Sequence, residues 1–112
     1  MRFEDIYWHD GQILGWTVTS STDQSDTGAV VITAAVYESL QSPERFEIEI
    51  VFENVKNLSV ACNFAELAEH FSFGNIDWAT KEGARNYRFD LFGDNSFELS
   101  SGKVSIRQKK RA

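Results

Sequence analysis

The residues best suited to chemistry in this sequence are His9 and Asp10, which stand side by side before Gly11. An imidazole titrates near neutral pH and a neighbouring carboxylate can orient it, so such a pair can act as a catalytic base, bind a metal ion or contact a partner. The motif is short, and no third ligand follows at a spacing typical of a metal site. We therefore expect a structural role, with both side chains bonding backbone around a turn at Asp10 and Gly11.

A second pair to consider is Cys62 with His70, since a thiol beside an imidazole can act as a nucleophile. Reactive cysteines need an electropositive and accessible setting, whereas Cys62 ends an apolar segment of an acidic chain. We expect a buried, unreactive thiol. Asp23 and Asp26 lack the ligand spacing of a calcium loop. The sequence therefore predicts no enzyme, no metal and no cofactor.

Glutamates alternate with large apolar residues between residues 45 and 53. Successive side chains of a strand point to opposite faces, so this pattern gives one apolar face and one acidic face. The acidic face carries Glu47, Glu49 and Glu53. The sequence thus predicts a half-buried strand with an outward row of carboxylates.

The formal net charge of −6 is unevenly distributed along the chain. Residues 107–111 hold four of the eleven basic residues, so residues 1–106 hold seven basic and seventeen acidic residues, a net charge of −10. A globule this acidic repels nucleic acid and attracts basic proteins. The acidic strand face is either an ordinary solvated surface or part of a docking site for a basic protein. The candidate docking residues are Glu47, Glu49, Glu53, Trp8, His9 and Asp10.

The three tryptophans either pack in the core or stack on a ligand. Trp16 shares strand parity with Leu14 and Val18, which favours the core. Trp8 falls outside that register and is expected at the surface. A small-ligand site built on tryptophan is the alternative, and it requires a deep, largely apolar pocket with a few polar groups.

The elements that position these residues are predicted to be strands. Alternating apolar residues indicate strands over 12–20, 45–53 and 57–62, followed by a meander of shorter strands between residues 76 and 106. Residues 29–38 are apolar on both parities, so this strand is expected to be central and covered on both faces.

One short helix is expected over residues 64–71, because Asn63 and Glu66 resemble a capping box before an apolar face. The predicted fold is mostly β, an antiparallel sandwich or half-barrel of about seven or eight strands with this helix packed on a sheet face. The helix contacts are expected from Phe64, Leu67 and Phe71. The predicted core residues are Phe46, Ile48, Ile50, Phe52, Phe89, Leu91, Val104 and Ile106.

A chain of 112 residues has the size of one domain, predicted here as residues 1–106 with a basic tail over 107–112. Its apolar stretches are far shorter than the roughly 20 residues that span a bilayer, which argues against a membrane partner. Acids near the N-terminus argue against a signal peptide, and a single cysteine excludes an internal disulfide. The expected location is the cytoplasm.

The order of these pieces resembles a set of small bacterial β-rich proteins, some of which are classed as immunity proteins of polymorphic toxin systems. The resemblance is carried by the His9-Asp10-Gly11 motif leading into Gln12-Ile13-Leu14, by the long amphipathic strand, and by the closing segments 87–91 and 97–99. It implies a non-catalytic inhibitor that binds a basic toxin, such as a nuclease. Only His9 and Asp10 match a motif of that set, and the resemblance implies no particular role for either residue. A ligand-binding or purely structural domain is the alternative.

Overall fold

The computed structural model describes residues 1–20, 26–62 and 75–109. These residues form a short 3-10 turn, η1 (Phe3–Asp5), and eight strands. The helix predicted over residues 64–71, together with His70, lies outside the described residues.

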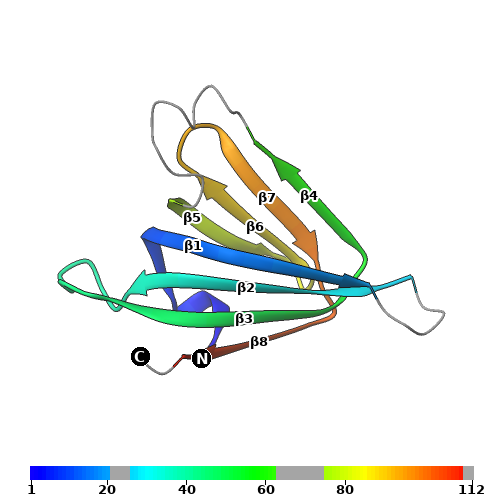
Figure 1. Cartoon of the computed structure of the whole chain (residues 1–112), viewed down its shortest axis with the longest axis horizontal. Helices are drawn as coiled ribbons and strands as arrows, with labels where there is room; N and C mark the ends of the chain where they lie inside the picture. Colours follow the sequence, from blue (N-terminus) through cyan, green and yellow to red (C-terminus); the bar gives the residue numbers. More distant parts are fainter. Residues whose placement is uncertain (21–25, 63–74, 110–112) are drawn as a thin grey trace.

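The eight strands form two antiparallel sheets of four (Figure 1). One, here called sheet A, has the order β1-β2-β3-β8, and the other, sheet B, has the order β4-β7-β6-β5. The strands of sheet A are β1 (Tyr7–Ser20), β2 (Gly28–Tyr37), β3 (Arg45–Val55) and β8 (Lys103–Gln108). Those of sheet B are β4 (Asn57–Ala61), β5 (Ile76–Glu82), β6 (Asn86–Leu91) and β7 (Asn95–Ser100). The predicted mostly β, antiparallel fold is confirmed, and it is an open sandwich.

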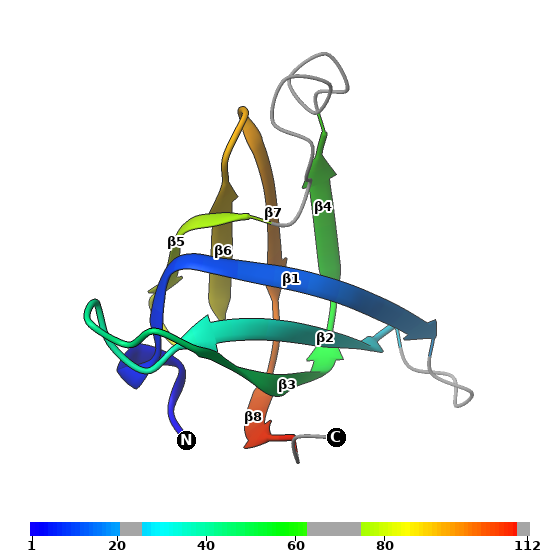
Figure 2. The ribbon, with the colours of Figure 1, turned by 60° about the vertical axis from the view of Figure 1, so that its left-hand side comes forward.

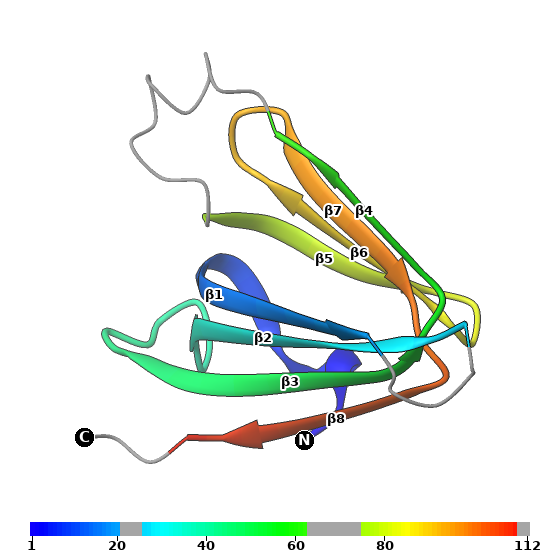
Figure 3. The same ribbon diagram turned by 45° about the vertical axis from the view of Figure 1, so that its right-hand side comes forward.

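The two sheets share one continuous corner (Figures 1 and 3). β3 pairs with β8 in sheet A, and their continuations β4 and β7 pair in sheet B. Asn54 turns the chain with a φ of 55°, a left-handed conformation that asparagine tolerates. The buried hydroxyl of Ser101 lies 2.7 Å from the carbonyl oxygen of Glu53, and the amide of Gly102 donates to the same oxygen. Strands that bend from one sheet into the next are typical of sandwiches whose sheets cross, as Figure 2 shows here.

The alternation in β3 is the sequence pattern that matches the structure best. Ile48, Ile50 and Phe52 are fully buried, and the intervening side chains point to the outer face of sheet A. Of the eight predicted core residues, five are buried. The other three are partly buried and pack against the core: Phe46, Val104 and Ile106.

The strand predicted to be central, residues 29–38, is β2, which lies between β1 and β3. Its inward residues Val30 and Ile32 are buried, but Val31 and Thr33 on the other face remain partly exposed. Coverage of both faces is therefore a wrong prediction. The sequence of β2 is apolar at almost every position because its outward residues are also small or apolar. Only the inward residues are buried.

An aromatic cluster fills the space between the sheets. The rings of Phe89 and Phe97 stack with centroids 4.5 Å apart, and Phe3 and Trp8 meet Phe89 edge-on. The indole nitrogen of Trp8 donates to the carbonyl oxygen of Phe3 at 3.2 Å, and Trp8 is 2% exposed. The prediction of a surface Trp8 is wrong, because η1 folds Phe3 back beneath it.

The opposite error applies to Trp16. Its ring touches Phe97 at a centroid distance of 5.7 Å, yet Trp16 is 40% exposed, and Leu14 and Val18 are exposed with it. These residues lie on β1, the edge strand of sheet A, so the predicted core role is wrong. Trp16 pairs with the buried Ile32 of β2, so both side chains lie on the same face of sheet A. At the edge of the sheet, however, a side chain is covered by a neighbouring strand on one side only, and Trp16 stays exposed.

Candidate functional site

His9 lies on β1 against β5, where two carboxylates flank its ring. Its Nδ1 is 3.0 Å from the carbonyl oxygen of Asp77 and 3.7 Å from that residue's carboxylate. The Nε2 is 3.6 Å from the Asp10 carboxylate. The backbone bond expected for His9 is present, but it reaches a distant strand instead of a local turn.

Asp10 and Gly11 do not turn the chain as predicted. They form a bulge inside β1, where the four residues between Tyr7 and Gln12 lie opposite a single residue of β2, Val36. Asp10 adopts a φ of 62°, and a Cβ on Gly11 would come within 2.9 Å of the carbonyl oxygen of Trp8. The bulge aims the His9 side chain away from β2 and toward Asp77.

The chemistry available to His9 is limited by these contacts. The His9 side chain is 38% exposed, and its Nδ1 forms a hydrogen bond with a backbone carbonyl. In residues 1–20, 26–62 and 75–109, no group of three or more His, Cys, Asp and Glu side chains is arranged to hold a metal ion. The adjoining hollow of about 250 Å³ includes Ser39 and Ser42, whose hydroxyls bond each other at 3.1 Å. The imidazole thus lies between two carboxylates at the surface.

Further carboxylates gather beyond Asp77. A hollow of about 440 Å³ is lined by Asp77, Asp90 and Asp94, the last on the turn from β6 to β7. Its one lining cation is Arg88, which donates to Asp90 at 2.8 Å. We call Asp10, Asp77 and Asp94 the acidic end. Within the described part of the chain, His9 is the only side chain that forms an ion pair with Asp10 or Asp77.

The acidic end and the neighbouring His9 bring together two predicted site residues, His9 and Asp10, with two that sequence reasoning missed, Asp77 and Asp94. Asp94 lies in a turn signal, Gly93-Asp94-Asn95, and Asp77 in an alternating segment, so each has an ordinary local role. Nothing local relates either residue to His9, because the contact depends on β1 crossing to β5.

The predicted row of Glu47, Glu49 and Glu53 is present on the outer face of β3, but it is paired with cations. Glu49 meets Arg107 at 2.7 Å, Glu53 meets Lys103 at 3.5 Å, and Glu47 meets Lys109 at 3.9 Å. We call these three pairs the ionic ladder. The cations belong to the edge strand β8 and the residue after it, so they form a second row beside the first.

The ladder also revises the predicted basic tail. β8 runs to Gln108, and the amide of Lys109 donates to the carbonyl oxygen of Glu47 at 2.9 Å. The predicted domain boundary after residue 106 therefore falls inside a strand. Arg107 and Lys109 neutralise the acidic row, so a charge of −10 for a globule without its tail overstates the field over β3.

Replacing Glu49 with glutamine should lower the free energy of unfolding by about 0.5–1 kcal/mol, the upper range for an ion pair near the surface. Glu49 is the most protected acid of the ladder, with 19% of its side chain exposed, and it makes the shortest pair. Urea unfolding at low and high salt measures the effect, which should shrink as salt screens the pair. A loss that salt does not change would contradict an electrostatic origin. Glu82→Gln, on a strand remote from β8, is the control.

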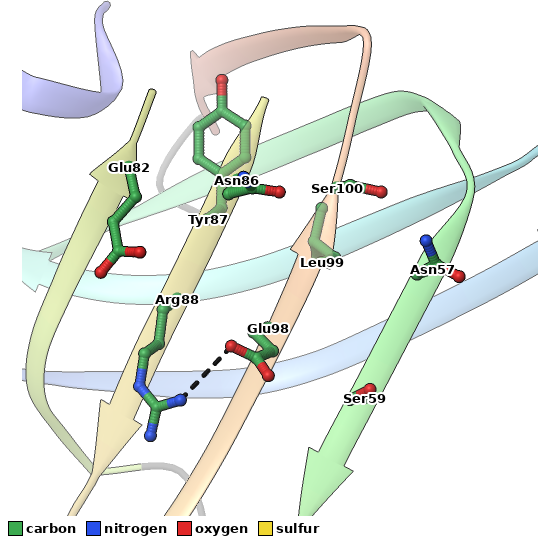
Figure 4. Close-up of a pocket in the computed structure, with 9 residues that line it drawn as sticks. All are labelled: Asn57, Ser59, Glu82, Asn86, Tyr87, Arg88, Glu98, Leu99 and Ser100. Atoms are coloured by element: carbon green, nitrogen blue, oxygen red, sulfur yellow. Dashed lines mark hydrogen bonds and ion pairs between the residues drawn. The ribbon is translucent and has the colours of Figure 1, made fainter. Parts of the chain in front are cut away.

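A polar hollow of about 370 Å³ lies on the outer face of sheet B (Figure 4). Arg88 projects into it and bonds Glu98 at 3.3 Å as well as Asp90. The hydrogen bond and charge of Asp90, followed by the charge of Glu98, raise the pKa of Arg88 above its ordinary value. Most of the lining is polar, and no tryptophan contributes. The hollow thus lacks the apolar character expected of a tryptophan-based ligand site.

Two further residues considered in the sequence analysis, Cys62 and Asp26, belong to neither the ionic ladder nor the acidic end. Cys62 is exposed just beyond the end of β4, so the predicted burial of its thiol is wrong. Asp26 borders a hollow between the end of β1 and the start of β4. No helix within the described ranges is long and apolar enough to cross a membrane.

Comparisons of this chain with protein-family models, with curated proteins and with solved structures found no match. The function must therefore be inferred from the geometry and charge of the surfaces described above. Two surfaces differ in how their acids are paired: the acids of the ionic ladder pair with lysine or arginine, whereas Asp10 and Asp77 of the acidic end form ion pairs, among the described residues, with His9 alone.

Proposed function

We propose that this chain is a non-catalytic protein-binding module, that its partner is a cationic protein, and that the partner docks on the acidic end. The observation that carries the proposal is that, among the described residues, the carboxylates of Asp10 and Asp77 form ion pairs with His9 alone, since Arg45 bonds the backbone carbonyl of Asp10 and not its carboxylate. Carboxylates without a counterion project a field that raises the encounter rate with a positively charged surface.

The ionic ladder is the weaker docking candidate, although Glu47, Glu49 and Glu53 were the residues first expected to bind a basic partner. A cationic partner would have to displace Lys103, Arg107 and Lys109, which already lie against these acids. Exchanging one ion pair for another yields little net free energy at a solvated surface. Trp8 is excluded from either surface because it is buried.

A non-catalytic role fits the state of His9. Its Nδ1 lies 3.0 Å from the carbonyl oxygen of Asp77, and its Nε2 lies 3.6 Å from the Asp10 carboxylate, so both nitrogens are engaged within the chain. The resemblance to immunity proteins supplies the partner class, a toxin with a cationic active face. If that resemblance holds, the gene for the toxin lies beside the gene for this chain.

The proposal is tested by two charge-matched double variants. Asp10→Asn with Asp77→Asn removes two charges from the acidic end, and Glu47→Gln with Glu53→Gln removes two from the ionic ladder. The partner is obtained by affinity capture at low salt from the source organism, identified by mass spectrometry and purified. Association rates are then measured across a salt series. We expect the acidic-end variant to associate about tenfold more slowly at low salt and with a shallower salt dependence.

The control variant should behave like the unmodified chain, because its net charge matches that of the test variant. Asparagine also tolerates the left-handed conformation of residue 10, so the bulge is preserved. Equal slowing of both variants would mean that only net charge matters. Slowing of the ladder variant alone would move the docking site to β3. Recovery of no cationic protein would contradict the proposed function itself.

A further inference from the structure

We infer that the outer face of sheet B is a binding site for an uncharged oligosaccharide, held by the polar side chains around Arg88 and by the ring of Trp78. This face carries the side chains that alternate with the buried Ala79, Phe89 and Phe97. Figure 4 shows polar side chains from all four strands around the arginine. The inference does not depend on the cationic partner of the acidic end, because it uses other side chains.

Arg88 is fixed at the centre of this face. It lies on β6, between β5 and β7, and its guanidinium bonds Asp90 at 2.8 Å and Glu98 at 3.3 Å. Two carboxylates offset its charge, so the hollow offers little attraction to an anion. A guanidinium has more N–H donors than these two bonds use, so Arg88 can still donate to an oxygen of a ligand. Because the group is already held in place, binding orders little further.

Uncharged polar side chains surround the arginine. Ser59 and Asn57 of β4, Ser100 of β7 and Asn86 of β6 line the hollow of about 370 Å³. Among the described residues, none of these four side chains has a hydrogen-bond partner. Amides and hydroxyls can both donate and accept hydrogen bonds. The hydroxyl groups of a sugar do the same, so this lining matches a neutral ligand that carries many of them.

Trp78 adds an apolar surface to the same face, beyond the hollow. It pairs with Asp90, as Thr80 pairs with Arg88, so the indole follows the arginine by one position on this face, about 6.7 Å along β5. Trp78 is 49% exposed, and within the described part of the chain no aromatic ring or cation packs on it. A sugar ring has C–H groups on its faces and hydroxyls at its rim. Stacked on an indole, it would leave the hydroxyls free for the polar side chains.

The length and charge of the face narrow the class of ligand. Trp78 and Glu82 lie about 13 Å apart along β5, which suits a chain of sugars better than a single sugar. An anion would meet the carboxylates of Glu82, Asp90 and Glu98. A wholly apolar ligand would leave the amides and hydroxyls unpaired, which costs free energy when water is displaced. A cationic ligand is the remaining alternative, and the experiment below separates it from a neutral one.

The inference is tested by calorimetric titration of the chain with short neutral oligosaccharides of glucose, xylose, mannose and N-acetylglucosamine. At least one should bind, with an affinity that salt does not change. Trp78→Ala should weaken that binding about tenfold, and Asn86→Ala about fivefold. Both positions are exposed, so both variants should fold. Trp16→Ala is the matched control, because it removes an exposed tryptophan from the other sheet and should leave the affinity unchanged.

The deacetylated form of the N-acetylglucosamine oligomer has the same backbone and carries positive charges. Binding of this form alone, with an affinity that falls as salt rises and does not respond to Trp78→Ala, would mean that the acids attract any cation and would overturn the inference. Failure of every neutral oligosaccharide to bind at millimolar concentration would overturn it too, as would equal losses for Trp78→Ala and Trp16→Ala. None of these results changes the expected behaviour of the double variant at Asp10 and Asp77, so the proposed function is judged separately.

Discussion

Replacing Phe89 with alanine should lower the free energy of unfolding by about 3–5 kcal/mol, the range for deleting a large aromatic side chain from a close-packed core. Phe89 is 0% exposed and touches aromatic residues from both ends of the chain. Its ring stacks on Phe97 at 4.5 Å and 13°, and it meets Trp8 edge-on at 5.3 Å. Alanine therefore removes both the transfer free energy of the ring and several ring–ring contacts at once.

Urea unfolding followed by circular dichroism measures this loss. Leu40→Ala is the matched control, because Leu40 is 73% exposed and its loss should change the free energy by no more than about 0.5 kcal/mol. Phe89→Leu retains part of the buried volume and keeps the comparison possible if the alanine variant does not fold. A loss below about 1 kcal/mol for Phe89→Ala would contradict the packing between the sheets.

Trp8→Ala should also destabilise the fold by about 3–5 kcal/mol, with no separate effect on partner binding beyond that caused by unfolding. Trp8 is buried between Phe3 and Phe89, and its indole nitrogen satisfies the Phe3 carbonyl oxygen. Removing the indole leaves a cavity and takes away one of the two hydrogen bonds that the Phe3 carbonyl oxygen accepts, the other coming from the Ile6 amide. An exposed, partner-binding Trp8, as the sequence suggested, would give the reverse result: reduced binding with stability unchanged.

Trp78→Ala separates these two outcomes, because Trp78 is the tryptophan with the most exposed surface and should lose little stability. Thermal unfolding of both variants gives the comparison, supported by the near-ultraviolet circular dichroism spectrum, to which the buried Trp8 should contribute more than the exposed Trp78. Equal stability of the two variants would place Trp8 outside the core. Trp8→Phe should recover part of the loss, since phenylalanine refills most of the cavity but cannot donate to Phe3.

The face that each β3 side chain would occupy was predictable from sequence. Alternation is a property of one strand, so Ile48, Ile50 and Phe52 could be placed inward and Glu49 outward without knowledge of any neighbour. The antiparallel β class followed from the same reasoning, because several short alternating segments cannot each bury an apolar face unless they assemble into sheets.

The partners of those faces were not predictable. Glu49 and Arg107 are 58 positions apart, and they meet only because β8 returns from the corner at Ser101 to pair with β3. His9 and Asp77 meet across a separation of 68 residues. Such contacts depend on which strands become neighbours and in what register, and local alternation carries no information about either.

The two tryptophans show the division between sequence and tertiary structure. The sequence by itself determined which residues share a side of each strand, because strand geometry repeats every two residues. Only the tertiary structure decided that β1 is an edge, which leaves Trp16 exposed, and that η1 folds over Trp8, which buries it. It also decided which acids pair with lysine or arginine: those of the ionic ladder do, whereas Asp10 and Asp77 pair only with His9 among the residues that the structure describes. Burial and charge pairing are properties of what lies opposite a residue, and strand order, set by the whole chain, selects that neighbour.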